Sequence, residues 1–300
     1  MQPSRPATSM PKKAMTRCAN CWPMLDKEDW TMNLLIKSET QGRDIVALPE
    51  GALEYVGFSA YRLEAGDRLP LNAGDHELCV VLLTGHASVS GEAPGQGAFS
   101  WENIGDRHSV FEEKSPFAVY LPPDSQAQFT ALGPAHLAVC KAPGDRTKRA
   151  PARLITPDSM KRSVRGKNAN TRYVCDILPD TEVAHSLLVV EVRTPSGHSS
   201  SYPPHKHDLD NLPHESFLEE TYYHQVNPPQ GFVFQRVYTD DRSIDQAMAV
   251  ENSDLVVVPK GYHPVTVPYG YESYYLNVMA GPTRAWQFHN DPQHSWLLEL

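Results

Sequence analysis

Residues 78–85 read LCVVLLTG, six apolar side chains in a row followed by a Thr-Gly turn. Such a run is typical of a β-strand, because aliphatic and β-branched side chains pack well on a pleated surface and glycine ends the pattern. Long segments with helical periodicity are absent, and 26 prolines and 18 glycines punctuate the chain. Seven further runs of this type follow: FAVYLP (117–122), HLAVCKA (136–142), SLLVVEVRT (186–194), TYYHQV (221–226), GFVFQRVYT (231–239), DLVVVPKG (254–261) and YYLNVMAG (274–281). The sequence therefore predicts an all-β protein, built as a sandwich, a jelly roll or barrels.

The chain repeats itself loosely, which predicts two similar barrels in tandem. In each half an acidic residue enters an apolar strand, Glu77 in the first and Glu220 in the second, and a later apolar run ends in proline before a polar turn. Residues 142–172 between the halves are basic, polar and poor in strand signals. We expect a flexible tail (1–31), a first barrel (32–150), a linker (151–172) and a second barrel (173–300).

Composition and charge exclude several classes of protein. The hydrophobic content of 40% and the charged content of 21% are those of a folded globular chain. A net charge of -9 argues against general binding to nucleic acid or to a membrane surface. The first 30 residues lack the apolar segment of a secretory signal. Five widely spread cysteines, with only Cys18 and Cys21 as a CxxC pair, favour a reducing cytoplasmic location.

The stretch SYPPHKHD at 201–208 indicates a metal site. On a strand, residues i and i+2 face the same way, so His205 and His207 aim two imidazoles into one space. The pair Glu219–Glu220 and then His263 follow downstream. Three histidines and one glutamate suit zinc, iron, manganese or nickel and leave coordination positions open for a substrate. An HxH pair alone is more often surface histidine, and the residues themselves leave the choice between the two glutamates open.

These motifs resemble those of the cupin superfamily, in which HxH and Glu are followed by PxG and His. The gap between His207 and the glutamates is longer here, and Pro259 stands one residue closer to His263. SYPPHKHD, EETYYHQ, GFVFQRVYTDDRSID, VVVPKGYHPV and GPTRAWQFHNDPQHSW together resemble the 5-deoxyglucuronate isomerase family of myo-inositol catabolism. The related 5-keto-4-deoxyuronate isomerases carry PPHxHD followed by Glu-x-Tyr, and this likeness selects Glu220 as the fourth ligand. It therefore implies one divalent ion, with zinc as first choice and manganese or iron as alternatives.

The resemblance implies an aldose–ketose isomerisation of 5-deoxy-D-glucuronate to 2-deoxy-5-keto-D-gluconate through a metal-stabilised enediolate. A proton must move from C2 to C1, and Tyr222 and His224 share the face of Glu220 on a regular strand, whereas Glu219 lies opposite. Lys260, which stands three residues before His263 and so near the expected metal, is a third catalytic candidate. For the substrate carboxylate we consider Arg172, Arg284, Arg236 and Lys260, and for its hydroxyls Tyr275 or Tyr274. The 208–217 loop is a candidate cover for the barrel mouth, with His214 not a ligand. A small sugar acid is the expected partner, and a homo-oligomer is expected by family analogy.

Two other functions fit part of the pattern. Three histidines and one glutamate also suit the iron of a cupin dioxygenase, and a vestigial metal would leave a non-catalytic sugar-binding protein. The first half lacks an equivalent ligand set, because His76 and Glu77 are adjacent and VYLPPDSQ has no histidine at the position of His263. We therefore expect the first barrel to be a structural copy without metal.

Overall fold

The computed structural model describes residues 33–300, and these residues are almost entirely β-structure. Their helical segments are three short 3-10 turns, Pro157–Ser159, Asn168–Asn170 and Ser295–Leu298. The all-β prediction is therefore confirmed. Within the same range no helix is long and apolar enough to cross a membrane. The expectations for the tail (1–31) and for the Cys18–Cys21 pair lie outside the described residues.

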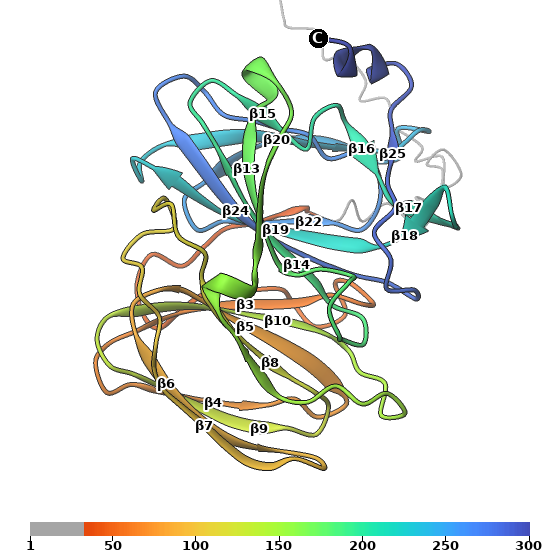
Figure 1. The fold of residues 1–300 in the computed structure, drawn as a ribbon. Helices are drawn as coiled ribbons and strands as arrows, with labels where there is room; N and C mark the ends of the chain where they lie inside the picture. The colour runs from red at the N-terminus through yellow and green to blue at the C-terminus, as the bar shows by residue number, and fades with distance from the viewer. Residues whose placement is uncertain (1–32) are drawn as a thin grey trace, which may run out of the picture. The chain divides into compact units, whose positions relative to one another are not determined.

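A six-stranded and a four-stranded sheet form the first half of the fold, coloured orange to yellow-green in Figure 1. The larger sheet has the order β11-β8-β5-β10-β3-β2 and the smaller one β4-β9-β6-β7. Side chains from both sheets, including Leu78, Val80 and Phe129, enclose an apolar core between them. The strands are β2 (Asp44–Ala47), β3 (Gly57–Leu63), β4 (Arg68–Asn72), β5 (His76–Thr84), β6 (Ala87–Ala93), β7 (Gly97–Ile104), β8 (Phe117–Leu121), β9 (Gln126–Ala131), β10 (Ala135–Pro143) and β11 (Arg153–Ile155).

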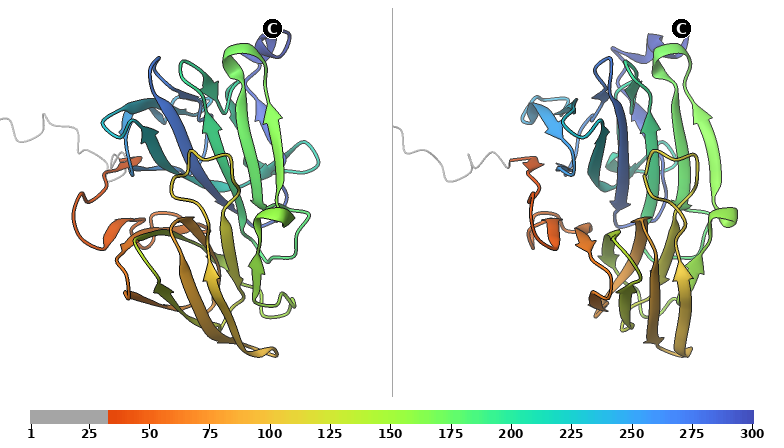
Figure 2. Two further views of the ribbon diagram at one scale, coloured as in Figure 1. Left: turned by 60° about the vertical axis from the view of Figure 1, so that its left-hand side comes forward. Right: turned by 90° about the vertical axis from the view of Figure 1, so that its left-hand side faces the viewer.

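The second half repeats this plan with a seven-stranded sheet, β1-β22-β19-β24-β14-β13-β12, and a four-stranded sheet, β15-β23-β20-β21. Two small ribbons, β16-β25 and β17-β18, are added. The two further views of Figure 2 show the same separation into two groups of strands. The strands are β1 (Leu35–Ile36), β12 (Lys161–Arg165), β13 (Arg172–Leu178), β14 (Leu188–Thr194), β15 (Ser199–Ser200), β16 (His205–Lys206), β17 (Asp208–Asn211), β18 (Glu215–Phe217), β19 (Glu219–Asn227), β20 (Phe232–Tyr238), β21 (Asp245–Glu251), β22 (Leu255–Val258), β23 (Val265–Thr266), β24 (Glu272–Ala280) and β25 (His289–Asn290).

A third apolar core joins the two large sheets and explains the continuous run at 78–85. In β5, Leu78, Val80 and Leu82 face the interior of the first half. The alternate residues Cys79, Val81 and Leu83 face the other way and pack with side chains of β24 in the second half. Both faces of the strand are therefore buried, so its sequence is apolar throughout rather than alternating.

Edge strands of both large sheets come from outside the half that they complete. β1, from the start of the described chain, pairs with β22 of the second half. The expected linker contains two strands: β11 pairs with β8 of the first half, and β12 pairs with β13 of the second. The sequence of β12, KRSVR, carried little strand signal because this edge strand is largely exposed and polar. The segment 151–172 thus completes a sheet edge in each half as well as connecting them.

Two buried carboxylates clasp the halves to each other. Glu77, at the start of β5, accepts hydrogen bonds from the backbone N–H groups of residues 185, 186 and 187 in the second half. Glu219, at the start of β19, accepts hydrogen bonds from those of residues 54, 55 and 56 in the first half. Each clasp satisfies three consecutive backbone donors with one charged acceptor, which makes these hydrogen bonds strong. By its contacts Glu77 is the counterpart of Glu219. The internal repeat in the sequence pairs Glu77 with Glu220 instead.

Candidate metal centre

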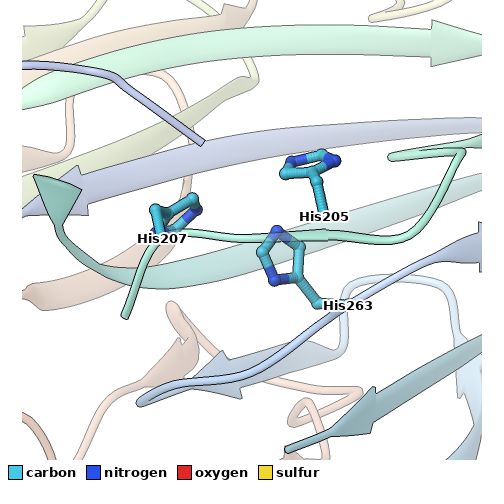
Figure 3. A group of neighbouring side chains, drawn as sticks. All are labelled: His205, His207 and His263. Atoms are coloured by element: carbon cyan, nitrogen blue, oxygen red, sulfur yellow. The ribbon is translucent and has the colours of Figure 1, made fainter. Parts of the chain in front are cut away.

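Three imidazoles gather within the second half. His205 and His207 come from β16 and the residue after it, and His263 comes from the turn between β22 and β23. One ligand nitrogen from each lies within 4.8 Å of the others, and Figure 3 shows the three rings around one space. The centroid of the His205 ring is 4.8 Å from that of His263, which in turn is 5.1 Å from that of His207. Among the described residues this is the group of histidine, cysteine or acidic side chains that could hold a metal ion.

The carboxylate of Glu220 adjoins two of the three imidazoles. Its Oε2 atom lies 3.1 Å from Nε2 of His207 and 3.1 Å from Nε2 of His263. The side chain is 2% exposed and points into the second half, whereas its neighbour Glu219 points to the clasp on the opposite face. The alternation of side chains along β19 thus separates the two glutamates.

The hydrogen bonds of two histidines leave a lone pair directed at the cluster. Nδ1 of His207 lies 2.9 Å from the carbonyl oxygen of Leu218, and Nδ1 of His263 lies 2.8 Å from that of Gly261. A carbonyl oxygen only accepts, so each Nδ1 carries the hydrogen and each neutral ring has an unprotonated Nε2. Two lone pairs against a carboxylate oxygen are unfavourable unless a cation lies between them. The donor set therefore fits a divalent ion.

Electrostatics keep two of the imidazoles neutral. Burial lowers the pKa of both His205 and His263 to about 3, so both rings can act as neutral donors at pH 7. Burial also acts to lower the pKa of His207, but its hydrogen bond to Glu220 and the charge of that carboxylate outweigh burial and raise it. Without a metal, the raised pKa thus favours a proton on Nε2 of His207. A bound ion would take the place of that proton.

A network of charged side chains around Lys206 connects the segments that carry the three histidines. Lys206, between the two histidines, places Nζ at 2.6 Å from Asp208, 3.3 Å from Asp240 and 3.6 Å from Glu215. Asp208 in turn accepts the N–H of Gly261 at 2.9 Å. Since the carbonyl of Gly261 holds Nδ1 of His263, this chain of contacts links the strand that carries His205 and His207 to the turn that carries the third histidine. Sequence reasoning missed this network, because Lys206 reads as an ordinary surface lysine.

The predicted tyrosines lie beside the cluster. The ring centroid of Tyr222 is 5.7 Å from that of His263 and 4.9 Å from that of Tyr275. The Oγ of Ser201 lies 3.0 Å from the hydroxyl of Tyr222 and 3.4 Å from that of Tyr275. The pKa of Tyr222 is raised well above its ordinary value, first by burial and then by the charge of Glu220, so the phenol keeps its proton. Tyr274 faces the other way and donates to Glu191.

His224 is buried two residues further along β19. Its Nε2 lies 2.8 Å from the side-chain oxygen of Gln235, which fixes the hydrogen on Nε2 and leaves Nδ1 as an acceptor without a hydrogen-bond partner. Its ring stacks near Tyr222 and Tyr275 at centroid distances of 5.9 and 5.6 Å. Burial lowers the pKa of His224 to about 4.

Arg172 lines a cavity of about 580 Å³ that reaches His205. Its Nη1 donates to the carbonyl oxygens of Asn170 and Tyr202, and among the described residues no carboxylate forms an ion pair with it. Arg165 and Lys167 line the same cavity, and Trp286, Phe288 and the C-terminal leucines complete its wall. This half-buried guanidinium without an acidic partner is a suitable receptor for an anion.

The structure does not bring the other predicted cations to the cluster. All donor nitrogens of Arg284 are used by the carbonyl oxygens of residues 179, 180, 182 and 187, so this side chain fixes a loop. Lys260 is exposed. Arg236 forms a two-pronged ion pair with Asp245. Spacing along the chain placed these residues near the motifs but could not show which way each side chain points.

The first half lacks a comparable set among its described residues. Leu78 in the first half occupies the position of Glu220 in the second, because Leu78 follows Glu77 as Glu220 follows Glu219. The side chains around it are aliphatic or aromatic. The metal-free, structural role expected of the first barrel stays a prediction.

Two sheet pairs in tandem, with histidines and one glutamate gathered inside the second, define a cupin-type protein. The model of the KduI/IolB family matches residues 34–297, and the chain belongs to that family. Relatives named 5-deoxy-glucuronate isomerase include one from Geobacillus kaustophilus, 54% identical over 86% of this chain and 92% of its own. Another, from Bacillus subtilis strain 168, is 53% identical over 82% of this chain and 89% of its own.

Solved structures agree with this assignment. An IolB-like protein from Salmonella typhimurium LT2 superposes with a TM-score of 0.84 at 48% identity, covering 88% of this chain and 99% of its own. Oxalate decarboxylase of Lactobacillus farciminis superposes with a TM-score of 0.60 at 11% identity, covering 86% of this chain and 88% of its own. At that identity the second likeness concerns the fold alone.

Proposed function

We propose that the protein is a 5-deoxy-glucuronate isomerase, which converts the aldose 5-deoxy-D-glucuronate into the ketose 2-deoxy-5-keto-D-gluconate. The observation that carries the proposal is the inward cluster of three histidines with Glu220 beside it, in a chain that is 54% identical over 260 residues to a relative of that name. The reaction moves one proton from C2 to C1 and shifts the carbonyl, so it needs neither an oxidant nor an organic cofactor.

The proposed ligands of one divalent ion are His205, His207, Glu220 and His263. Zinc is our first choice, with manganese and iron as alternatives, because nitrogen and oxygen donors of this kind suit all three. The bound ion would act as a Lewis acid on the carbonyl and hydroxyl oxygens at C1 and C2. Nε2 of His207 and Nε2 of His263 each lie 3.1 Å from the same oxygen of Glu220, and this convergence of donor atoms supports the ligand set.

We assign the proton-handling side of the site to Tyr222 and His224, which share one face of β19 with Glu220. Tyr222 retains its proton, so its hydroxyl is suited to donate a hydrogen bond to a substrate oxygen. The Nδ1 atom of His224, which has no hydrogen-bond partner among the described residues, is the proposed proton acceptor. The ring of Tyr275 lies next to that of His224. Lys260 has no place in this assignment, because its side chain is exposed.

The carboxylate of the substrate is assigned to Arg172, with Tyr275 as a neighbouring hydroxyl. Arg172 stands in the cavity that reaches His205, and within residues 33–300 no acidic side chain pairs with it. Arg284 drops out of the proposal because backbone carbonyls occupy its guanidinium. We keep the homo-oligomer as a prediction, for which sedimentation of the purified protein is the test.

The test is an NMR time course with 5-deoxy-D-glucuronate in D2O, using metal-loaded and chelator-treated protein side by side. We expect the ketose to appear with the loaded protein and to be lost with the chelator, and deuterium at C1 would indicate transfer through an exchangeable group. The variant His263→Ala should bind less metal and convert little substrate. His214→Ala is the matched control, since His214 is exposed and outside the cluster. A folded, loaded protein that converts nothing would overturn the proposal, and oxygen uptake would then test the dioxygenase alternative.

A further inference from the structure

Ser201 occupies an unusual position next to the proposed site. It is 6% exposed, and its φ is +50°, in the left-handed region that residues other than glycine rarely adopt. It ends the approach to the strand that carries His205 and His207. Backbone strain of this kind persists only where the surroundings hold it, and it is concentrated at functional sites.

The strained backbone brings one hydroxyl against two phenols. The Oγ of Ser201 lies 3.0 Å from the hydroxyl of Tyr222 and 3.4 Å from that of Tyr275, and all three side chains are buried. A serine hydroxyl has one hydrogen to donate and two lone pairs. If it donates to the oxygen of Tyr222, the hydrogen of that phenol is free to point elsewhere. The ring centroid of His263, one of the proposed metal ligands, lies 5.7 Å from that of Tyr222.

We propose that Ser201 is a positioning residue for the isomerisation, and that it directs the hydroxyl of Tyr222 toward the substrate oxygens. This inference rests on the proposed function, because it gives Tyr222 its substrate contact. The left-handed backbone is the means by which the hydroxyl reaches both phenols. Ser201 thus acts through Tyr222, without contacting the reacting atoms itself.

Alanine and glycine at position 201 separate the hydroxyl from the backbone. Both remove Oγ, but glycine adopts positive φ without strain whereas alanine does not. If the hydroxyl matters, Ser201→Gly and Ser201→Ala should both lower kcat by about tenfold or more, as is typical when a supporting hydrogen bond is removed. KM should change little, because the ground-state contacts of the carboxylate remain. Ser201→Gly should be at least as stable as the wild type.

Ser253 offers a matched control for the hydroxyl. It is also a buried serine with positive φ, +71°, in the turn after β21, but its Oγ accepts from the side-chain amide of Asn252. Its backbone N–H donates to the carbonyl oxygen of His224, and that bond remains when Oγ is removed. Ser253→Ala and Ser253→Gly should leave kcat unchanged. The metal content of all four variants should equal that of the wild type, which shows that any loss is not a loss of the ion.

A second readout does not depend on turnover. With 13C-labelled tyrosine, the ring-carbon signals of Tyr222 and Tyr275, identified by their loss in the Phe variants, should shift in Ser201→Ala and Ser201→Gly and stay fixed in the Ser253 variants. A Ser201→Gly protein with wild-type kcat would overturn the positioning role, and unshifted signals would overturn the contact itself. Should the wild type convert no substrate, it is the proposed function that fails, and the role of Ser201 fails with it.

Discussion

At the scale of single residues, the proposed metal centre depends on backbone groups as much as on its ligands. Gly261 uses its N–H to bind Asp208 and its carbonyl to hold Nδ1 of His263. Its φ is +94°, and a Cβ atom there would stand 2.5 Å from the carbonyl oxygen of Tyr238. Glycine is therefore required twice at this position, by conformation and by space. The orientation of His263 follows from this one turn.

We predict that Gly261→Ala destabilises the protein by about 1–3 kcal/mol and weakens metal binding by about tenfold or more. Backbone strain lowers the free energy of unfolding. Displacement of the Gly261 carbonyl misorients the ring of His263 and so weakens metal binding. Thermal unfolding and metal titration measure the two effects. Gly270→Ala is the control, because Gly270 has a similar φ of +98° with open space around it. It should show strain without loss of metal affinity, and an equal loss in both variants would refute the role of Gly261.

At the scale of elements, β19 assigns different tasks to its two faces. Glu220, Tyr222 and His224 point into the second half, toward the cluster and the polar interior. Glu219 and Tyr223 point to the first half, where Glu219 binds three backbone N–H groups. A shift of one residue in strand register would exchange these roles, so the pairing of β19 with β22 and β24 determines which glutamate can bind metal.

Two neighbouring substitutions test this division. Glu219→Gln should lower the free energy of unfolding by about 1–3 kcal/mol, because an amide replaces a charged acceptor for three backbone donors, and should leave metal content unchanged. Glu220→Gln should leave the fold intact and weaken metal binding by more than about 100-fold, beyond the loss typical of a residue that only supports a ligand. Urea unfolding and metal analysis of both variants decide the matter. A loss of metal from Glu219→Gln without unfolding would contradict the assignment.

The sequence predicted these elements unevenly. The four proposed ligands could be found because metal binding demands particular residue types at particular spacings. The clasps, the pairing of β1 with β22 and the Lys206 network could not, because they join segments more than a hundred residues apart or depend on side-chain direction. Arg284 illustrates the second point: a guanidinium near a motif can bind substrate or carbonyl oxygens, and only the fold distinguishes the two.

At the scale of the whole molecule, polar contacts specify how the two halves join. Arg107 of the first half forms a buried ion pair with Glu191 of the second, 2.9 Å between Nη2 and Oε2. His136 on β10 accepts the amide hydrogen of Gln225 at 3.0 Å and bonds the hydroxyl of Tyr223 at 2.9 Å, both on β19. These contacts lie around the shared apolar core, so association of the halves is both hydrophobic and directional.

We predict that His136 makes the joined state sensitive to acid. Burial, followed by Arg62 and Arg107, lowers the pKa of His136 to about 3, against about 6.5 in an unfolded chain. The unfolded state therefore binds the extra proton between these values. Stability from this group is complete above pH 6.5 and falls by about 1.4 kcal/mol per unit as the pH drops below it.

Urea unfolding of chelator-treated protein between pH 7 and pH 4.5 measures this dependence without interference from metal release. Against the wild type, His136→Gln should have a shallower slope by about one proton, since glutamine does not titrate. His214→Gln, at an exposed histidine, should leave the slope unchanged. Equal slopes for His136→Gln and the wild type would show that His136 is not the group responsible.

The reciprocal clasps have a consequence for how mutations act in a cell. Each half provides the acceptor that holds a loop of the other, so damage at Glu77 or at residues 185–187 reaches the whole chain although the metal ligands are untouched. Such variants would reduce the amount of protein that survives quality control rather than the turnover of each surviving molecule. Mutations that abolish activity should therefore be of two kinds. Changes on the clasp face of β19 should reduce the amount of protein but not its specific activity, whereas changes on the metal-facing side should leave the amount normal and the protein inactive.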